Sequence, residues 1–225
     1  LVGKHKQMDL MAFTEAKTLT EFRDSFFPTL ERAFKRGAQG EVKSFLRSKT
    51  SDSIRYLEII SQKYDVAVAN PPYTDSADFG PELKKFIEAN YKKPEKFNTN
   101  LYAAFIKRCC ELADDAGKVG MVHPPTFMYI KTFEDVRKFI IEKTHISLFV
   151  EWGYLGMFNP SARVDSAMYV LEKDIKEQDS LFIKLNDLYE TRRYDALMEA
   201  YDDYLLGKDN RIVYTLPQSK LKLIK

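Results

Sequence analysis

The sequence lacks several features that would assign it to a class directly. Its 225 residues include nine glycines and two cysteines, and no Gly-x-Gly element occurs. No apolar run approaches the roughly 18 residues that suggest a membrane span, and no signal-peptide pattern opens the chain. The two cysteines, Cys109 and Cys110, are adjacent and cannot bridge each other. A disulfide scaffold and a membrane partner are therefore not indicated, and a reducing cytoplasmic location is expected.

The chain also lacks a large excess of charge of either sign. Lys and Arg total 35 and Asp and Glu total 33, which leaves a formal net charge of +2. This balance does not indicate a strongly basic nucleic-acid-binding domain, although a local basic face remains compatible with it. Asp75 and Asp78 make no convincing metal pair, and no metal site is predicted.

The chain does contain 44% hydrophobic residues, enough for one substantial core with an appendage. Residues 1–63 show helical spacing and predict a helical segment. Residues 64–174 alternate strand and helix patterns, and residues 175–225 predict an α/β extension. The patterns together indicate an α/β fold.

The most informative stretch is residues 64–73, Tyr-Asp-Val-Ala-Val-Ala-Asn-Pro-Pro-Tyr. The apolar run from Val66 to Ala69 predicts a buried strand. Two consecutive prolines cannot continue a hydrogen-bonded ladder, so the strand must end at Asn70. Ligands bind at the carboxyl ends of strands in open α/β sheets. The polar amide and aromatic ring therefore predict a site here, with an ordinary surface turn as the alternative.

This motif resembles the catalytic motif of amino-group methyltransferases that use S-adenosylmethionine, above all the adenine-N6 DNA methyltransferases. The later elements resemble the PglX-like methyltransferases of BREX phage-defence systems and the type II and IIG restriction–modification methylases. The resemblance implies a partial Rossmann-like methyltransferase sheet, with substrate-side strands and an antiparallel terminal hairpin, flanked by helices. It also implies site-specific methylation of adenine N6 in restriction–modification or phage defence.

The resemblance assigns the chemistry to Asn70, Pro71, Pro72 and Tyr73. An adenine amine is a poor nucleophile because its lone pair is delocalised into the ring. The Asn70 oxygen and the Pro71 carbonyl would each accept one amine N–H, which favours a pyramidal nitrogen and stabilises the developing charge. The two prolines would hold that carbonyl in place. Tyr73 would stack on an adenine flipped out of double-stranded DNA.

Two further substrate contacts are implied by the resemblance. A helix is predicted from Asn100, with Gly117 as its C-cap, and Tyr102 would lie beside the catalytic loop at its start. Phe158 lies between two strands that the family pairs as an antiparallel hairpin at the sheet edge. It is a candidate for contacting the flipped base, with core packing as an equal alternative.

Two local sequence patterns predict structural features. His123 follows a predicted strand, and we expect it to be structural, because this methyl transfer needs no strong base. Residues 132–135, Thr-Phe-Glu-Asp, predict a capping box that begins the next helix.

The glycine-rich turn with which the family binds its cofactor is missing. Only Gly3, Gly37 and Gly40 precede Asn70. We therefore expect a fragment that starts after the cofactor-binding strands and ends before a target-recognition region. S-adenosylmethionine is the expected cofactor of the intact enzyme, its binding residues are unknown, and the fragment alone is expected to be inactive.

Three alternatives remain open at this point. Protein-glutamine N5 methyltransferases use the same Asn-Pro-Pro-Tyr loop, but the long segment 74–98 and the C-terminal extension argue against them. A non-catalytic DNA-binding or assembly module would instead use the exposed edge of strand 64–69 to form a homodimer. A nuclease is a weaker third, because Glu41-Val42-Lys43 lacks a preceding Pro-Asp partner.

Overall fold

The computed structural model describes residues 52, 55–56, 59–154, 157, 163–175 and 178–221. The chain divides into two units, residues 1–62 and 63–225. In the first unit, residues 52, 55–56 and 59–61 are helical. The other helices expected before residue 63 lie outside the described residues. No helix in the described ranges is both long enough and apolar enough to cross a membrane.

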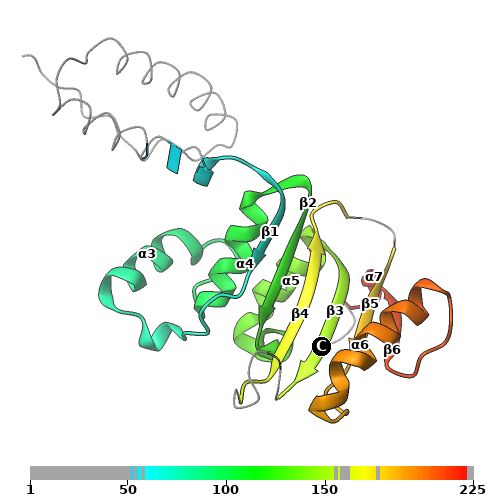
Figure 1. The fold of residues 1–225 in the computed structure, drawn as a ribbon. Helices are drawn as coiled ribbons and strands as arrows, with labels where there is room; N and C mark the ends of the chain where they lie inside the picture. The colour runs from blue at the N-terminus through cyan, green and yellow to red at the C-terminus, as the bar shows by residue number, and fades with distance from the viewer. Residues whose placement is uncertain are drawn as a thin grey trace, which may run out of the picture. The chain divides into compact units, whose positions relative to one another are not determined.

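A six-stranded mixed sheet with the order β1-β2-β4-β3-β5-β6 forms the centre of the second unit (Figure 1). Its strands are β1 (Tyr64–Ala69), β2 (Ala113–His123), β3 (His145–Gly153), β4 (Ser166–Glu172), β5 (Asp179–Lys184) and β6 (Val213–Pro217). The α-helices are α3 (Pro81–Tyr91), α4 (Leu101–Leu112), α5 (Glu134–Lys143), α6 (Glu190–Leu205) and α7 (Gln218–Leu221). Three short 3-10 turns join them: η2 (Ser76–Asp78), η3 (Pro125–Met128) and η4 (Lys131–Phe133).

Four of the strands run in the same direction. β1 is parallel to β2, β4 is antiparallel to both β2 and β3, and β3 is parallel to β5. The carboxyl ends of β1, β2, β3 and β5 therefore meet at one edge, called here the carboxyl edge. The expected α/β fold with an antiparallel β3–β4 pair is confirmed.

The β3–β4 pair does not lie at the edge of the sheet, and this expectation was wrong. β5 adds to β3 in parallel and β6 adds to β5 in antiparallel, so the C-terminal extension continues the same sheet. The extension can pair because β3 offers a second edge opposite β4. Long-range pairing of this kind leaves no local signal in the sequence.

Helices pack on the two faces of the sheet at different places. The core beneath α4 and α5 includes Phe149 and Tyr169, whereas the core beneath α6 includes Val150. Phe149 and Val150 are successive residues of β3, so they point to opposite faces. α4 and α5 therefore cover one face of the sheet, and α6 covers the other face over β3 and β5.

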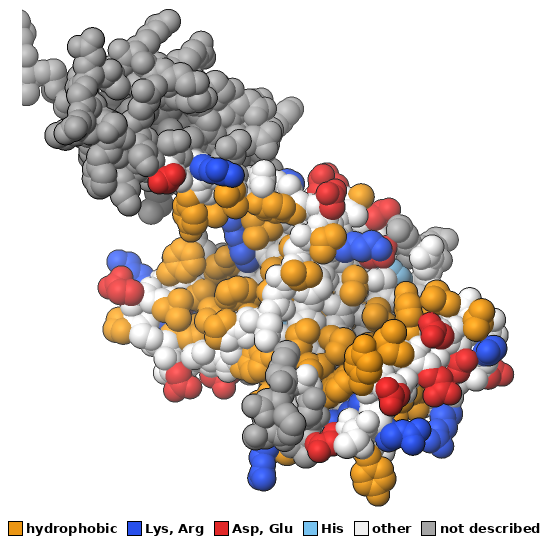
Figure 2. All heavy atoms as spheres, viewed as in Figure 1, with side chains coloured by type: hydrophobic (Ala, Val, Ile, Leu, Met, Phe, Trp, Pro, Cys, Tyr) orange, Lys and Arg blue, Asp and Glu red, His pale blue; other side chains and the backbone are white. Residues whose placement is uncertain are grey.

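β1 is covered on one face only. Ala67 and Ala69 pack against the core beneath α4, and their small side chains let the helix approach. Val66 and Val68 point to the other face and are 57% and 76% exposed. Figure 2 shows hydrophobic side chains gathered on the face of the second unit that is turned to the viewer. The expectation of a fully buried strand was wrong, because no other described element covers that face of β1.

The end of α4 also differs from the expectation. The helix begins at the predicted N-cap Asn100, but its C-cap is Ala113 and not Gly117. Gly117 lies in β2, where an added Cβ would lie 2.8 Å from the backbone nitrogen of Asp114 and 3.0 Å from the carbonyl oxygen of Tyr64. The glycine is needed for close approach at an irregular point in the β1–β2 pairing.

The predicted capping box is not formed. α5 begins at Glu134 after the turn η4, its N-cap is Phe133, and no side chain caps it. Phe133 is 5% exposed and packs in the core. Because that burial fixes the entry to the helix, Thr132 is not the N-cap residue. Val136 and Ile140 form the buried face of α5.

Candidate functional site at the carboxyl edge

The Asn-Pro-Pro-Tyr motif follows β1 directly at the carboxyl edge. Asn70 is exposed, Pro71 is buried and Tyr73 is half-buried. The hydroxyl of Tyr73 donates a 2.7 Å hydrogen bond to Oδ1 of Asn70. Partial burial raises the pKa of Tyr73 above its usual value, so the phenol remains a neutral donor at physiological pH. The buried ring of Pro71 anchors the loop, while the amide of Asn70 faces solvent.

The side chain of Asn100 fixes the residues that follow the Asn-Pro-Pro-Tyr motif. Its Nδ2 donates to the Asp75 carboxylate at 2.7 Å, and its Oδ1 accepts from the backbone nitrogen of Tyr102 at 3.0 Å. The backbone nitrogen of Leu101 also donates to the Thr74 carbonyl at 2.9 Å. Asn100 is 4% exposed. One buried side chain therefore caps α4 and fixes the residues just after Tyr73.

His123 lies at the end of β2 and is fully buried. The Pro124 carbonyl can only accept, so the 2.8 Å contact makes Nδ1 the donor. Nε2 then accepts from the Tyr169 hydroxyl at 2.7 Å. Burial lowers the pKa of His123 to about 4. A neutral imidazole with both nitrogens engaged is a structural group, as expected from the sequence.

Tyr102 is 2% exposed and does not face solvent. Its ring stacks on His123 at a centroid distance of 4.3 Å and also stacks on Phe133 at 5.4 Å. Its hydroxyl lies 3.0 Å from that of Thr126, and burial raises its pKa to about 12. The expected contact of Tyr102 with substrate stays a prediction. Tyr102 packs beneath the site because it lies on the apolar face of α4.

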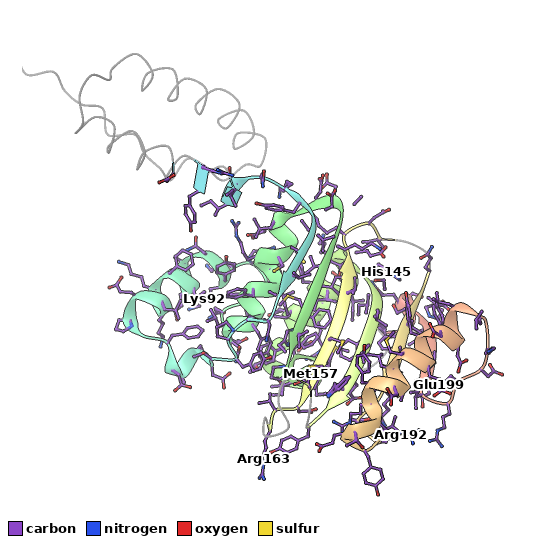
Figure 3. All side chains as sticks on the ribbon, viewed as in Figure 1. Lys92, His145, Met157, Arg163, Arg192 and Glu199 are labelled. Carbon is purple, nitrogen blue, oxygen red and sulfur yellow. The ribbon has the colours of Figure 1, made fainter. Side chains whose placement is uncertain are left out.

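Phe158 lies outside the described residues. Its described neighbours Met157 and Arg163 lie at the carboxyl edge (Figure 3), where β3 ends and β4 begins. β3 ends and β4 begins at the same edge as Asn70.

Sequence reasoning missed an exposed pair of residues at this edge. The turn after β2 presents Tyr129 and Ile130, which are 66% and 46% exposed. One guanidinium nitrogen of Arg137, Nη1, donates to the carbonyls of Phe127 and Ile130, each at 2.7 Å. The preceding Pro124-Pro125 indicates a rigid turn. Helical spacing alone does not show that Arg137 contacts the carbonyls of Phe127 and Ile130.

The described residues show neither a group suited to a metal ion nor a glycine-rich turn for a cofactor. The described part of the chain holds no group of three His, Cys, Asp or Glu residues suited to a metal ion. It also contains no glycine-rich turn of the kind expected to hold S-adenosylmethionine, and β1 lies at the outer edge of the described sheet.

Comparison with known proteins identifies the family. Residues 7–158, more than half of the chain, match the family described as Eco57I restriction-modification methylase. The adenine-specific methyltransferase BrxX of Escherichia coli O9:H4 (strain HS) is 26% identical over 157 residues, covering 65% of this chain and 12% of that protein. The type II restriction enzyme and methyltransferase RM.Eco57I of Escherichia coli is 24% identical over 158 residues, covering 69% and 15%.

Solved structures support the fold. The type IIG restriction endonuclease BpuSI superposes with a TM-score of 0.54 at 16% identity, covering 73% of this chain and 21% of that one. The type I methyltransferase subunit from Streptococcus thermophilus gives 0.50 at 14%, covering 72% and 36%. The chain spans less than a sixth of either curated relative named above. The match over residues 7–158 shows that the chain belongs to the Eco57I restriction-modification methylase family.

Proposed function

We propose that this chain carries the adenine-binding half of a DNA adenine-N6 methyltransferase that uses S-adenosylmethionine. The observation that carries the proposal is the exposed Asn70 amide at the carboxyl end of β1, anchored by a buried Pro71. The family match and the adenine-specific relative favour a nucleobase over a protein glutamine as the acceptor.

The proposed chemistry acts on the exocyclic amine of adenine. Asn70 Oδ1 and the Pro71 carbonyl each accept one N–H, which concentrates the nitrogen lone pair and stabilises the positive charge that grows on it. Tyr73 stacks on the base. In the resting geometry the Tyr73 hydroxyl donates to Asn70 Oδ1, and we propose that this hydrogen bond opens so that the Tyr73 ring can stack on the bound adenine. Asn100 keeps the loop exit fixed while that exchange occurs.

Double-stranded DNA is the proposed partner, with the target adenine flipped out of the helix. Phe158 is proposed to contact the flipped base, since β3 ends and β4 begins at the carboxyl edge and the labelled Met157 and Arg163 lie there (Figure 3). Tyr102 is proposed to act from beneath, by stacking on His123.

Binding of single-stranded oligonucleotides tests the proposal on the chain itself. An adenine-containing oligonucleotide and a matched oligonucleotide without adenine are titrated by fluorescence anisotropy. The wild type should prefer adenine, and Asn70→Ala should remove that preference. Asn90→Ala, an exposed asparagine on α3, is the control and should keep it. Equal affinity of wild type for both oligonucleotides would remove the support for an adenine site.

A methylation assay on the full-length protein tests the reaction. Methyl incorporation from labelled S-adenosylmethionine into DNA is expected for the wild type and should be lost in Asn70→Ala. Incorporation into a glutamine-containing peptide but not into DNA would instead favour the protein-glutamine alternative.

A further inference from the structure

The exposed pair Tyr129–Ile130 is held more rigidly than an ordinary surface turn. Arg137 donates to the carbonyls of Phe127 and Ile130 on either side of Tyr129. The backbone nitrogens of Tyr129 and Ile130 both donate to the Thr126 carbonyl, at 3.1 and 3.0 Å. Phe127, 2% exposed, anchors the turn in the core. The backbone is thus fixed while two apolar side chains remain in solvent.

Exposed apolar side chains on a fixed backbone are suited to binding, because little backbone conformational entropy is lost at contact. An isolated exposed apolar residue has no special meaning. Here an aromatic and a β-branched residue are adjacent, are fixed by a charged side chain and follow the carboxyl end of β2. That strand neighbours β1, with Met121 opposite Ala69. The pair therefore shares the carboxyl edge with the proposed adenine site.

The pair is nevertheless displaced from Asn70 along that edge. The Tyr129 hydroxyl reaches toward Glu151 near the end of β3, at 3.5 Å. β3 lies three strand positions from β1, which is roughly 14 Å at the usual spacing between strands. Tyr129 therefore does not share the space in front of Asn70. It lies farther along the carboxyl edge, near the end of β3.

We propose that Tyr129 and Ile130 form a wedge that fills the gap left in the DNA stack by the flipped adenine, with Arg137 as its positioning residue. This inference rests on the proposed function. Inserted apolar side chains can hold unstacked base steps open, and a flipped base leaves such a step. The pair would stabilise the open duplex, while Asn70 and Tyr73 bind the extruded base.

DNA that already contains a gap separates the two roles. A duplex with a central abasic site offers the gap without an adenine, whereas a single-stranded adenine oligonucleotide offers the base without a gap. The wild type should bind the abasic duplex about tenfold more tightly than the intact duplex, a factor typical of one stacked side chain. Tyr129→Ala and Ile130→Ala should lose most of this preference and bind the single strand unchanged.

Asn70→Ala should show the opposite pattern, losing adenine binding and keeping the abasic preference. Tyr214→Ala and Ile175→Ala, which alter a tyrosine and an isoleucine 53% and 57% exposed elsewhere on the molecule, should change neither. Arg137→Met should lower the abasic preference and speed hydrogen exchange at the amides of residues 129–130, and Arg137→Lys should restore part of both.

A wild type with no preference for the abasic duplex, or Tyr129→Ala and Ile130→Ala variants that retain it, would overturn the wedge. Either result leaves adenine binding by the single strand intact as support for the proposed function. Loss of the single-strand preference with the abasic preference kept would overturn the proposed adenine site, on which the role of the wedge in base flipping rests, and would leave only insertion of the pair into a gapped duplex.

Discussion

The Tyr73 hydroxyl and the Asn70 carboxamide oxygen form a hydrogen bond of 2.7 Å across the Pro-Pro dipeptide. The oxygen proposed to accept the adenine amine is therefore already engaged when no base is present. Two properties of Tyr73 can be separated by substitution. Its hydroxyl competes for Asn70, whereas its ring is available for stacking.

Tyr73→Phe removes the competitor and keeps the ring. Adenine-oligonucleotide binding should tighten by a small factor, because a hydrogen bond worth about 1 kcal/mol no longer has to be exchanged. Tyr73→Ala should weaken binding by about tenfold through loss of stacking. Anisotropy titrations measure both, with Tyr214→Ala as the control. Tighter binding by the alanine variant than by wild type would contradict the stacking role.

Asn100→Ala should destabilise the second unit. It removes the N-cap of α4, worth about 1 kcal/mol, and the bond to the Asp75 carboxylate, so we expect a loss of about 2–3 kcal/mol in urea unfolding. Asn90→Ala should lose less than about 0.5 kcal/mol. Asn100→Asp places two carboxylates together, and adding Asp75→Asn should recover stability. A double variant no better than Asn100→Asp would argue against the pair.

The free energy of unfolding should decrease as the pH is lowered, because His123 is buried in its neutral form. Its pKa is lowered from 6.5 to about 4 in the folded chain, so the unfolded chain binds the proton more readily. The stabilising contribution is complete above pH 6.5 and is lost as the pH falls toward 4, up to roughly 3 kcal/mol. Denaturant unfolding across this window should show a shallower slope for His123→Gln than for wild type. Identical slopes would mean that another group governs the transition.

The outer edge of β1 should support self-association of the chain by itself. β1 has no partner on that side among the described strands, and unpaired edges pair with other chains. Sedimentation should show a concentration-dependent dimer that Val68→Lys weakens, since Val68 is an exposed residue of this edge strand and charged side chains on edge strands oppose pairing. A monomer at all concentrations would exclude this contact.

The chain by itself should not bind S-adenosylmethionine at micromolar concentration. The glycine-rich turn expected for that role is missing from the sequence, and glycine lets a backbone approach such a ligand closely. Isothermal calorimetry should give no heat above dilution. A saturable heat would show that other residues of the chain supply the site.

The motif and its place were predictable because they depend on local rules. A strand ends where prolines begin, and Asn100 caps the helix that starts beside it. The errors involve long-range contacts. Gly117 resembled a helix terminator because its close approach to Tyr64 could not be read locally, and Thr132 resembled a cap because the burial of Phe133 was not visible.

The side chains that pack beneath the site could not be identified from the sequence either. Tyr102 matched an aromatic expected at the substrate, yet its neighbours His123 and Phe133 come from other elements and cover its ring. Only the fold brings the guanidinium of Arg137 to the turn carbonyls. The contacts of such residues can be identified only from a three-dimensional structure.

The burial of both cysteines has a practical consequence. Cys109 and Cys110 are 6% and 5% exposed, and burial raises the pKa of both thiols, that of Cys110 to about 12. The reactive thiolate is therefore scarce in the native state. A single cysteine introduced at Tyr129 could accept a maleimide dye without replacing either native thiol, and modification of Cys109 or Cys110 would then report unfolding.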